Sequence, residues 1–172
     1  CELQFGFLTE HKNDLLVFGN TILQGGLCFV EYVKIMINIV LYEPEIPQNT
    51  GNISRTCAVT GAHLHLIEPL GFRLNEKEIK RAGMDYWEHL DVHRYVNFAE
   101  FQEKHPDAKI WMATTKAKHT YTDVQFGPDD YIMFGKESAG IPEEILVKNP
   151  DTCIRIPMLS EIRSLNLSNS VA

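Results

Sequence analysis

The chain has 172 residues, of which 44% are hydrophobic and 23% charged, and these figures fit one domain with a single buried core. They exclude a disordered chain, and 11 glycines and 8 prolines without a period exclude a collagen-like one. The net charge of −7 argues against a nucleic-acid binder that relies on overall charge, although a local basic patch is compatible with it.

The four cysteines are widely spaced and form no CxxC pair, so the sequence predicts no metal centre. A chain of this length folds without disulfides, which favours a reducing, cytoplasmic setting. The apolar run over residues 25–30 is too short to span a membrane, and we expect no membrane association.

The first 35 residues show no sustained period of 2 or 3.6, whereas a clean strand pattern begins directly after Met36. We therefore interpret residues 36–172 as the domain and residues 1–35 as upstream sequence outside the natural protein. A genuine N-terminal arm is the alternative, and it stays open. Residues 164–172 look like the opening of a helix whose later turns are missing, so we expect the last helix to be truncated.

Five apolar runs, the first two of them ended by proline or glycine, predict buried strands. They are residues 37–42, 63–67, 110–114, 131–134 and 153–156. Helices are predicted over residues 49–60 before Gly61, over residues 76–83 after an Asn75–Glu78 capping box, after Asn97, and from Pro142 onward. Strands that alternate with helices predict an α/β fold, with a mostly parallel sheet and helices on both faces.

In such sheets ligands bind beyond the carboxyl ends of the strands. After the first strand, a proline-stiffened loop brings Asn49 and Asn52 to a helix start and Arg55 one turn further on. Backbone N–H groups and an arginine at that position suit a phosphate or a carboxylate. The alternative is that Asn49 only caps the helix and Arg55 is a solvated surface side chain.

After the fourth strand, Gly135 and Gly140 flank a turn that contains Glu137, and two glycines allow the backbone to approach a ligand closely. The spacing matches neither GxGxxG nor a Walker A motif, which disfavours dinucleotide dehydrogenases and P-loop NTPases.

After the fifth strand, residues 164–170 carry five hydroxyl or amide side chains. The simpler interpretation of this segment is a capped helix whose Leu165, Leu167 and Val171 face the core.

Together, the three loops resemble the three motifs of the SPOUT RNA methyltransferases. The matching residues are Asn49, Gly51, Asn52 and Arg55, then Phe134, Gly135, Glu137 and Gly140, then Ile156, Pro157 and Met158 followed by Ser164, Leu165, Asn166, Leu167 and Ser168. A narrower resemblance covers residues 36–172 and is carried by residues 41–52, 82–86 and 155–158. It is to the small tRNA (cytidine/uridine) 2′-O-methyltransferases that act on the wobble nucleotide of leucine tRNAs.

The resemblance implies an α/β sheet whose C-terminal segment forms a trefoil knot, incomplete here if the last helix is truncated. It also implies S-adenosylmethionine as cofactor with S-adenosylhomocysteine as product, tRNA as substrate, and a homodimer in which each site is completed by its neighbour. By position, the residues that would contact the cofactor are Ala113, Gly135, Ile156, Met158, Ser164 and Leu165.

The same resemblance points to Arg55 at the attacking ribose hydroxyl. A guanidinium is a poor base, so we expect Arg55 to orient the nucleotide and stabilise developing alkoxide while a substrate phosphate takes the proton. Asn49, Glu137 and Asn166 are expected to support the loops and Arg55.

Two other functions stay open: the same chemistry on ribosomal RNA, and a non-catalytic RNA-binding module on the same fold. A tRNA binder with a net charge of −7 needs focused positive surface. The candidate patch consists of Arg73, Lys77, Lys80 and Arg81. Its alternative is a solvated helix face balanced by nearby glutamates.

Overall fold

The computed structural model describes residues 37–73, 90–159 and 164–172. Its strands are β1 (Asn38–Tyr42), β2 (His63–Ile67), β3 (Val92–Tyr95), β4 (Ile110–Ala113), β5 (His119–Thr120), β6 (Tyr131–Phe134) and β7 (Cys153–Arg155). Its α-helices are α1 (Pro47–Thr60), α3 (Phe98–Lys104), α4 (Glu143–Leu146) and α5 (Leu167–Val171), with 3-10 turns over Tyr121–Asp123 and Pro150–Thr152.

The described strands form one sheet in the order β3-β2-β1-β6-β4-β7-β5. Every neighbouring pair is parallel, as the alternation of strands and helices predicts. The register places Val40 of β1 between His65 of β2 and Met133 of β6. The carboxyl ends of the central strands therefore meet at one edge of the sheet.

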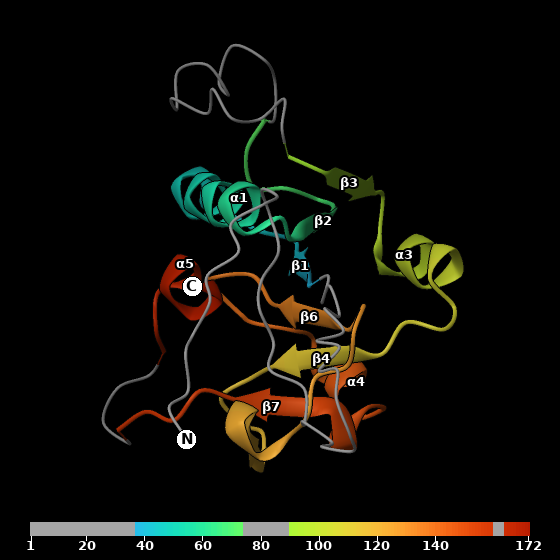
Figure 1. Ribbon diagram of the computed structural model, residues 1–172, viewed down its shortest axis with the longest axis vertical. Helices are drawn as coiled ribbons and strands as arrows, with labels where there is room; N and C mark the ends of the chain where they lie inside the picture. The colour runs from blue at the N-terminus through green and yellow to red at the C-terminus, as the bar shows by residue number, and fades with distance from the viewer. Residues whose placement is uncertain (1–36, 74–89, 160–163) are drawn as a thin grey trace, which may run out of the picture.

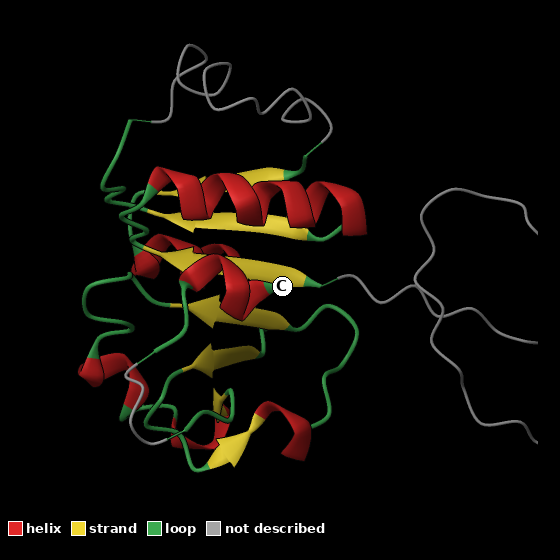
Figure 2. Ribbon diagram, turned by 90° about the vertical axis from the view of Figure 1, so that its left-hand side faces the viewer, coloured by secondary structure: helices red, strands yellow, loops and turns green. Residues whose placement is uncertain are grey.

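Helices cover both faces of this sheet (Figure 1). Helices α1 and α5 lie on one face, and Figure 2 shows α1 running lengthwise along the strands on that side. Helices α3 and α4 lie on the other face. Side chains alternate accordingly along β1, because Ile39 and Leu41 enter the core under α1 and α5 while Val40 enters the core under α3 and α4. The predicted fold class is confirmed.

Helix α1 begins two residues earlier than predicted. Pro47 occupies the first turn, where its missing N–H costs nothing, and Ile46 precedes it without a side-chain cap. The alternative in which Asn49 caps the helix is therefore wrong. At the other end, Gly61 adopts φ 76°, and its N–H donates to the carbonyl of Cys57 at 2.8 Å, as predicted for a helix terminator.

The predicted capping at Asn97 is confirmed in part. The side chain of Asn97 accepts from the N–H of Glu100, but the Glu100 carboxylate accepts from Val96 instead of Asn97. Pro142 is the N-cap of α4 and not its first helical residue. Strands β4 and β7 each end one residue before the predicted limit.

Two strands, β3 and β5, were not predicted. In β3 only Tyr95 is buried, and β5 has only two residues at the far edge of the described sheet, so neither forms an apolar run. The predicted helix over residues 76–83, residues 1–36 and the basic positions 77, 80 and 81 lie outside the described residues. Residues 160–163, on which the predicted knot depends, lie outside them too, so the knot stays a prediction.

Candidate functional site

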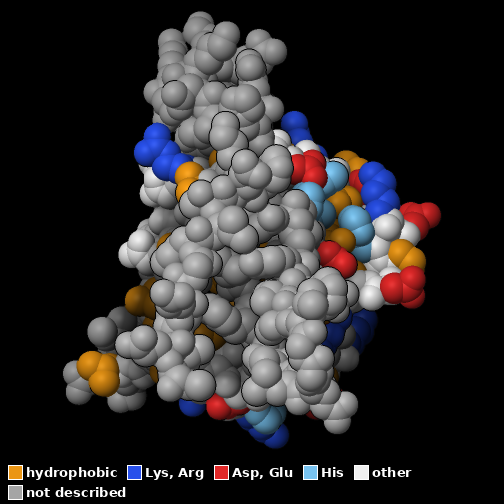
Figure 3. Space-filling model, in the orientation of Figure 1, with side chains coloured by type: hydrophobic (Ala, Val, Ile, Leu, Met, Phe, Trp, Pro, Cys, Tyr) orange, Lys and Arg blue, Asp and Glu red, His pale blue; other side chains and the backbone are white. Residues whose placement is uncertain are grey.

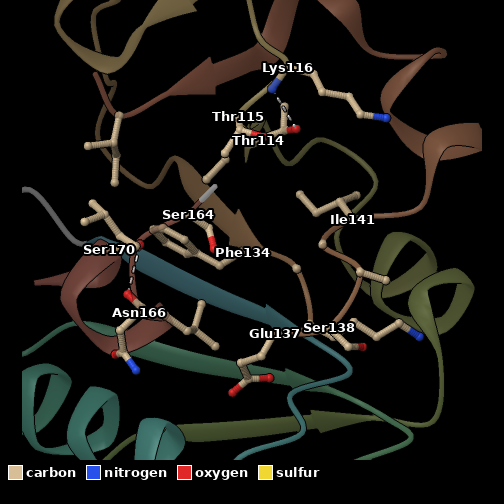
Figure 4. A pocket seen from close by; sticks show the side chains of 18 of the residues that line it. Thr114, Thr115, Lys116, Phe134, Glu137, Ser138, Ile141, Ser164, Asn166 and Ser170 are labelled. Atoms are coloured by element: carbon tan, nitrogen blue, oxygen red, sulfur yellow. Dashed lines mark hydrogen bonds between the residues drawn. The ribbon is translucent and has the colours of Figure 1, made fainter. Parts of the chain in front are cut away.

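A cavity of about 750 Å³ lies beyond the carboxyl ends of the central strands, and we call it the carboxyl-edge cavity. Its wall comes mainly from the segments that follow β4, β6 and β7 and from the start of α5. Figure 4 shows Thr114, Thr115 and Lys116 on one side of it, and Glu137, Ser138 and Asn166 on the opposite side. Its size is in the range of about 300–1,000 Å³ that is typical of small-molecule sites.

The loop after β6 requires glycine at Gly135. A Cβ atom there would lie 2.1 Å from the carbonyl carbon of Gly140 and 2.2 Å from the nitrogen of Ile141. The loop closes tightly because the N–H of Gly140 donates to the carbonyl of Lys136 at 2.8 Å, and Gly140 adopts φ 73°. The close approach that the sequence predicted at Gly135 is therefore an approach to its own loop.

Glu137 joins this loop to the one after β1. One carboxylate oxygen accepts from the N–H of Glu45 at 2.8 Å, and the other accepts from the N–H of Ile46 at 3.2 Å and from Asn49 Nδ2 at 2.9 Å. A carboxylate has only acceptor sites, so it suits three converging donors. Glu137 thus fixes the position of the loop that precedes α1.

Asn49 extends this connection to α5. It is 5% exposed, and its Oδ1 accepts from Asn166 Nδ2 at 3.0 Å while its Nδ2 donates to Glu137. Asn166 in turn caps α5, because its Oδ1 accepts from the N–H groups of Ser168 and Asn169. Glu137, Asn49 and Asn166 therefore form one hydrogen-bonded chain that links three loops, and we call it the carboxylate–amide chain.

Charged groups around the cavity pair with one another. The Glu45 carboxylate accepts from the hydroxyl and the N–H of Ser138 at 2.8 and 2.9 Å, and these bonds hold its pKa below the usual value. Lys136 donates to Glu43 at 2.9 Å, which raises the pKa of the lysine. Lys116 pairs with Glu143. The groups that remain to meet a ligand are mostly backbone and neutral side chains.

All six residues expected to contact a cofactor line this cavity: Ala113, Gly135, Ile156, Met158, Ser164 and Leu165. The expectation that Leu165 faces the core is wrong, because it is 43% exposed at the cavity, whereas Leu167 is buried and Val171 packs against the core. Sequence reasoning missed Thr114, Thr115 and Lys116. Thr114 is the last residue of a predicted strand and the other two directly follow it, so the end of that strand was the signal for them.

Asn49, Glu137 and Asn166 also line the cavity, but Arg55 is not among the described residues that do. Arg55 lies on the exposed side of α1, beyond the buried Asn49 and Ile53. Arg55, which these three residues were expected to support, is thus on the same helix as Asn49 but on a different side of it. Arg73 is exposed, as expected for a basic surface residue.

The described helices include none with the length and apolar character needed to cross a membrane.

The described strands form a parallel sheet covered by helices, with a cavity built from three loops at its carboxyl edge, and this arrangement is that of the SPOUT-class RNA methyltransferases. The pattern of the SpoU rRNA Methylase family matches residues 36–172, and the chain belongs to that family.

Relatives and solved structures agree with this assignment. The chain is 51% identical to the tRNA (cytidine(34)-2'-O)-methyltransferase of Aeromonas hydrophila over 138 residues, which are 80% of this chain and 88% of the relative. A structure from a study of the 2-OH methylation of C/U34 on tRNA is 44% identical with a TM-score of 0.74, covering 80% of this chain and 90% of that one.

A more distant structure shares the fold. The AdoMet-bound rRNA methyltransferase from Sinorhizobium meliloti is 23% identical with a TM-score of 0.69, and the match covers 79% of this chain but only 52% of the other.

Proposed function

We propose that this chain methylates the 2′-hydroxyl of the cytidine or uridine at position 34 of tRNA, with S-adenosylmethionine as methyl donor. The observation that carries the proposal is the 51% identity to an enzyme named for that reaction, over 80% of this chain and 88% of that enzyme. The carboxyl-edge cavity supports it, because it supplies a small-molecule site at the place where the family motifs meet.

The cavity fits the cofactor. Its volume suits a nucleoside with an amino-acid side chain, and the tight turn at Gly135 lets backbone groups form its wall. Pairing of Lys116 and Lys136 with carboxylates leaves few free charges to bind a phosphate, which suits a ligand without one. When bound, the cofactor supplies an electrophilic methyl group. Ala113, Gly135, Ile156, Met158, Ser164 and Leu165 are the residues we assign to hold it.

We assign Arg55 to the nucleotide. Its guanidinium orients the ribose and stabilises the negative charge that develops on the 2′-oxygen, and a substrate phosphate accepts the proton. Because Arg55 is not among the described residues that line the cavity of its own chain, we assign it to the cavity of a second copy in a homodimer. Its exposure on α1 supports this assignment.

The carboxylate–amide chain has a positioning role in this proposal. Glu137 accepts three N–H donors, and Asn49 and Asn166 use their amides to join α1 to α5. These contacts fix the loops that form the cavity. We assign no proton transfer to these three side chains. Asn49 also fixes the first turn of α1, the helix that carries Arg55.

For the substrate, tRNA is favoured over ribosomal RNA by the similarity to named relatives. The relative that is 51% identical is named for tRNA, whereas the rRNA methyltransferase structure is only 23% identical and shows the fold alone. Leucine tRNAs remain the expected targets from the motif resemblance. A cytoplasmic location fits both this substrate and the free thiols of Cys57 and Cys153.

The test is a methylation assay on purified tRNA and ribosomal RNA with S-adenosylmethionine, followed by mass spectrometry of the nucleosides and mapping of the modified position. We expect 2′-O-methylation at position 34 of tRNA. Methylation of ribosomal RNA alone would favour the rRNA function. Binding of S-adenosylhomocysteine without methylation of either RNA would favour a non-catalytic module, and binding of NAD instead would exclude the methyltransferase assignment.

Replacing Arg55 tests the mechanism. Arg55→Ala should lower the single-turnover rate by about 10²–10³-fold and leave S-adenosylhomocysteine affinity unchanged, because a charge-stabilising donor is lost outside the cofactor cavity. Arg55→Lys should recover little, since an ammonium lacks the planar fork. Arg94→Ala removes an exposed arginine from β3 and should leave the rate unchanged. A normal rate in Arg55→Ala would remove this residue from the mechanism.

Mixed chains test whether two copies share a site. Arg55→Ala chains are refolded together with Leu165→Glu chains, whose cofactor cavity is blocked. In mixed dimers one site then has both an intact arginine and an intact cavity, so part of the activity should return. If each chain uses its own arginine, both sites of the mixed dimer stay defective and no activity returns.

A further inference from the structure

Histidine side chains gather on the side of the molecule that carries β3 and α3, with acidic and basic side chains beside them (Figure 3). Three residues there form what we call the amino-edge cluster: His63, Asp91 and His93. His63 begins β2, Asp91 immediately precedes β3, and His93 lies within β3. The cluster is therefore at the opposite end of the strands from the carboxyl-edge cavity, and the methyl-transfer proposal does not use it.

The backbone brings these three residues together. Strands β2 and β3 are parallel, with Leu64 opposite Val92 and His65 opposite His93, and the N–H of Leu64 donates to the carbonyl of Asp91 at 3.0 Å. Because side chains alternate along a strand, His63 and Asp91 point to the same face as His93. The cluster is thus set by the pairing of two neighbouring strands.

The donor atoms of the amino-edge cluster are close enough to bind one ion. Asp91 Oδ1 lies 3.0 Å from His93 Nε2, and Asp91 Oδ2 accepts from His63 Nδ1. All three ligand atoms lie within 4.8 Å of one another. Two ligands at about 2.0–2.2 Å from the same ion are at most ~4.4 Å apart, so a small rotation of the partly exposed His63 ring closes the site.

The surroundings of His93 limit the orientation of its ring. His93 stacks on His65, with ring centroids 4.9 Å apart and an angle of 16° between the planes. His65 is 2% exposed and is fixed in turn, because Tyr95 Oη lies 2.8 Å from its Nδ1 and Asn38 Oδ1 lies 3.2 Å from its Nε2. Packing that orients a ligand lowers the entropy lost when an ion binds.

We propose that His63, Asp91 and His93 bind one divalent transition-metal ion of the zinc type, which joins β2 to the outermost strand of the described sheet. Two imidazoles and one carboxylate suit Zn²⁺, Co²⁺ or Ni²⁺, with solvent completing the coordination. On binding, the coordinating nitrogen of each neutral ring offers its lone pair, any proton it carried passes through solvent to the other ring nitrogen, and the metal lies beside Asp91. The ion stabilises the fold and takes no part in methyl transfer. This site departs from the sequence-based expectation of no metal centre.

The test is equilibrium dialysis of the metal-free full chain against low micromolar Zn²⁺, with the ion counted by mass spectrometry. We expect one ion per chain, and His63→Asn or His93→Asn should weaken its binding by more than about tenfold. His119→Asn is the matched control, because His119 is an exposed strand histidine on β5, at the other edge of the sheet. It should bind as the unchanged chain does.

Two further measurements separate this site from any other zinc-binding group in the chain. Zn²⁺ should raise the melting temperature of the unchanged chain and of His119→Asn but not of His93→Asn, because only an intact site favours the native state. The visible absorption of Co²⁺ should reveal nitrogen and oxygen ligands without thiolate. Equal Zn²⁺ uptake by the unchanged chain and His93→Asn, a thiolate signal, or no uptake at all would overturn the proposal.

Discussion

The two ends of the central strands carry different polar arrangements. At the carboxyl ends, long loops meet, and Glu137, Asn49 and Asn166 satisfy backbone and amide groups that lie 88 to 117 residues apart in sequence. At the amino ends of β2 and β3, the polar side chains belong to neighbouring strands, and rings stack directly on rings. The first arrangement creates an enclosed space for a ligand, whereas the second creates an exposed group of side chains.

One sheet can therefore carry a region that depends on backbone shape at one end of its strands and a region that depends on ionisable side chains at the other. The carboxyl-edge cavity depends on backbone geometry that a single methyl group would disrupt, as the 2.1 Å approach at Gly135 indicates. In the amino-edge cluster, imidazoles and a carboxylate share hydrogen bonds, and His93 stacks on the buried His65, whose pKa burial lowers. Changes of volume should therefore damage the first region, and changes of pH the second.

The largest expected effect comes from Gly135→Ala. The new Cβ would overlap the backbone of Gly140 and Ile141, so the loop must open, at a cost of at least about 3 kcal/mol in unfolding free energy and with loss of S-adenosylhomocysteine binding. Gly127→Ala is the matched control, because its Cβ would meet only the Asp130 side chain at 3.3 Å. Urea unfolding and calorimetry measure both quantities. Unchanged cofactor affinity in Gly135→Ala would show that the cavity tolerates a different loop.

A smaller effect is expected from Glu137→Gln. An amide group cannot accept on both sides, so one of the three N–H donors loses its acceptor, and unfolding free energy should fall by about 1–3 kcal/mol. Glu143→Gln makes the same chemical change in an exposed ion pair with Lys116 and should cost about 0–1 kcal/mol. Urea unfolding at neutral pH compares the two. Equal losses would mean that the carboxylate–amide chain contributes no more than a surface pair.

The smallest effect concerns pH and His65. Burial, followed by the charges of His93, His105 and His63, lowers the pKa of His65 from 6.5 to about 3, although Asp91 opposes this. Asn38 donates its Nδ2–H to the carbonyl of Asp129, so its Oδ1 accepts from His65 Nε2–H and Tyr95 donates to Nδ1. The native contacts therefore favour the neutral form of the His65 ring.

Between pH 6.5 and about 3, the unfolded chain binds a proton on His65 that the native chain does not bind. The stability contributed by this neutral ring is complete above pH 6.5 and is lost as the pH falls, at up to about 1.4 kcal/mol per pH unit. Urea unfolding in EDTA from pH 7 to pH 5 measures the slope. His65→Gln should flatten it and the exposed His119→Gln should not. An equal slope in His65→Gln would assign the acid sensitivity to other groups.

The sequence predicted the buried strands because each is covered on both faces and is therefore a continuous apolar run, as in Ile39–Leu41. It did not predict β3, whose His93 and Arg94 are exposed, and so the amino-edge cluster could not be foreseen although His63 lay in a predicted strand. Edge strands with polar side chains lack the hydrophobic signal on which such predictions depend.

The position of the cavity followed from the rule that ligands bind beyond strand ends, and the residues expected at it do line it. Their partners did not follow from the sequence. Nothing in the spacing shows that Glu137 accepts from Asn49 or that Arg55 lies outside the cavity wall, because both depend on how far α1 turns before the loops meet. Such contacts depend on how α1 and the loops are placed in space, which residue spacing does not show.

The hydrogen bond between Asn49 and Asn166 has a consequence for co-translational folding on the ribosome. The described strands can pair once residues up to Arg155 have left the exit tunnel, because all of them lie within that length. The amide of Asn49 must wait for a partner 117 residues further along the chain. Until α5 emerges, the nascent chain has a nearly complete sheet and an unfinished cavity. The ability to bind a ligand is therefore acquired only when α5 has emerged, after most of the fold already exists.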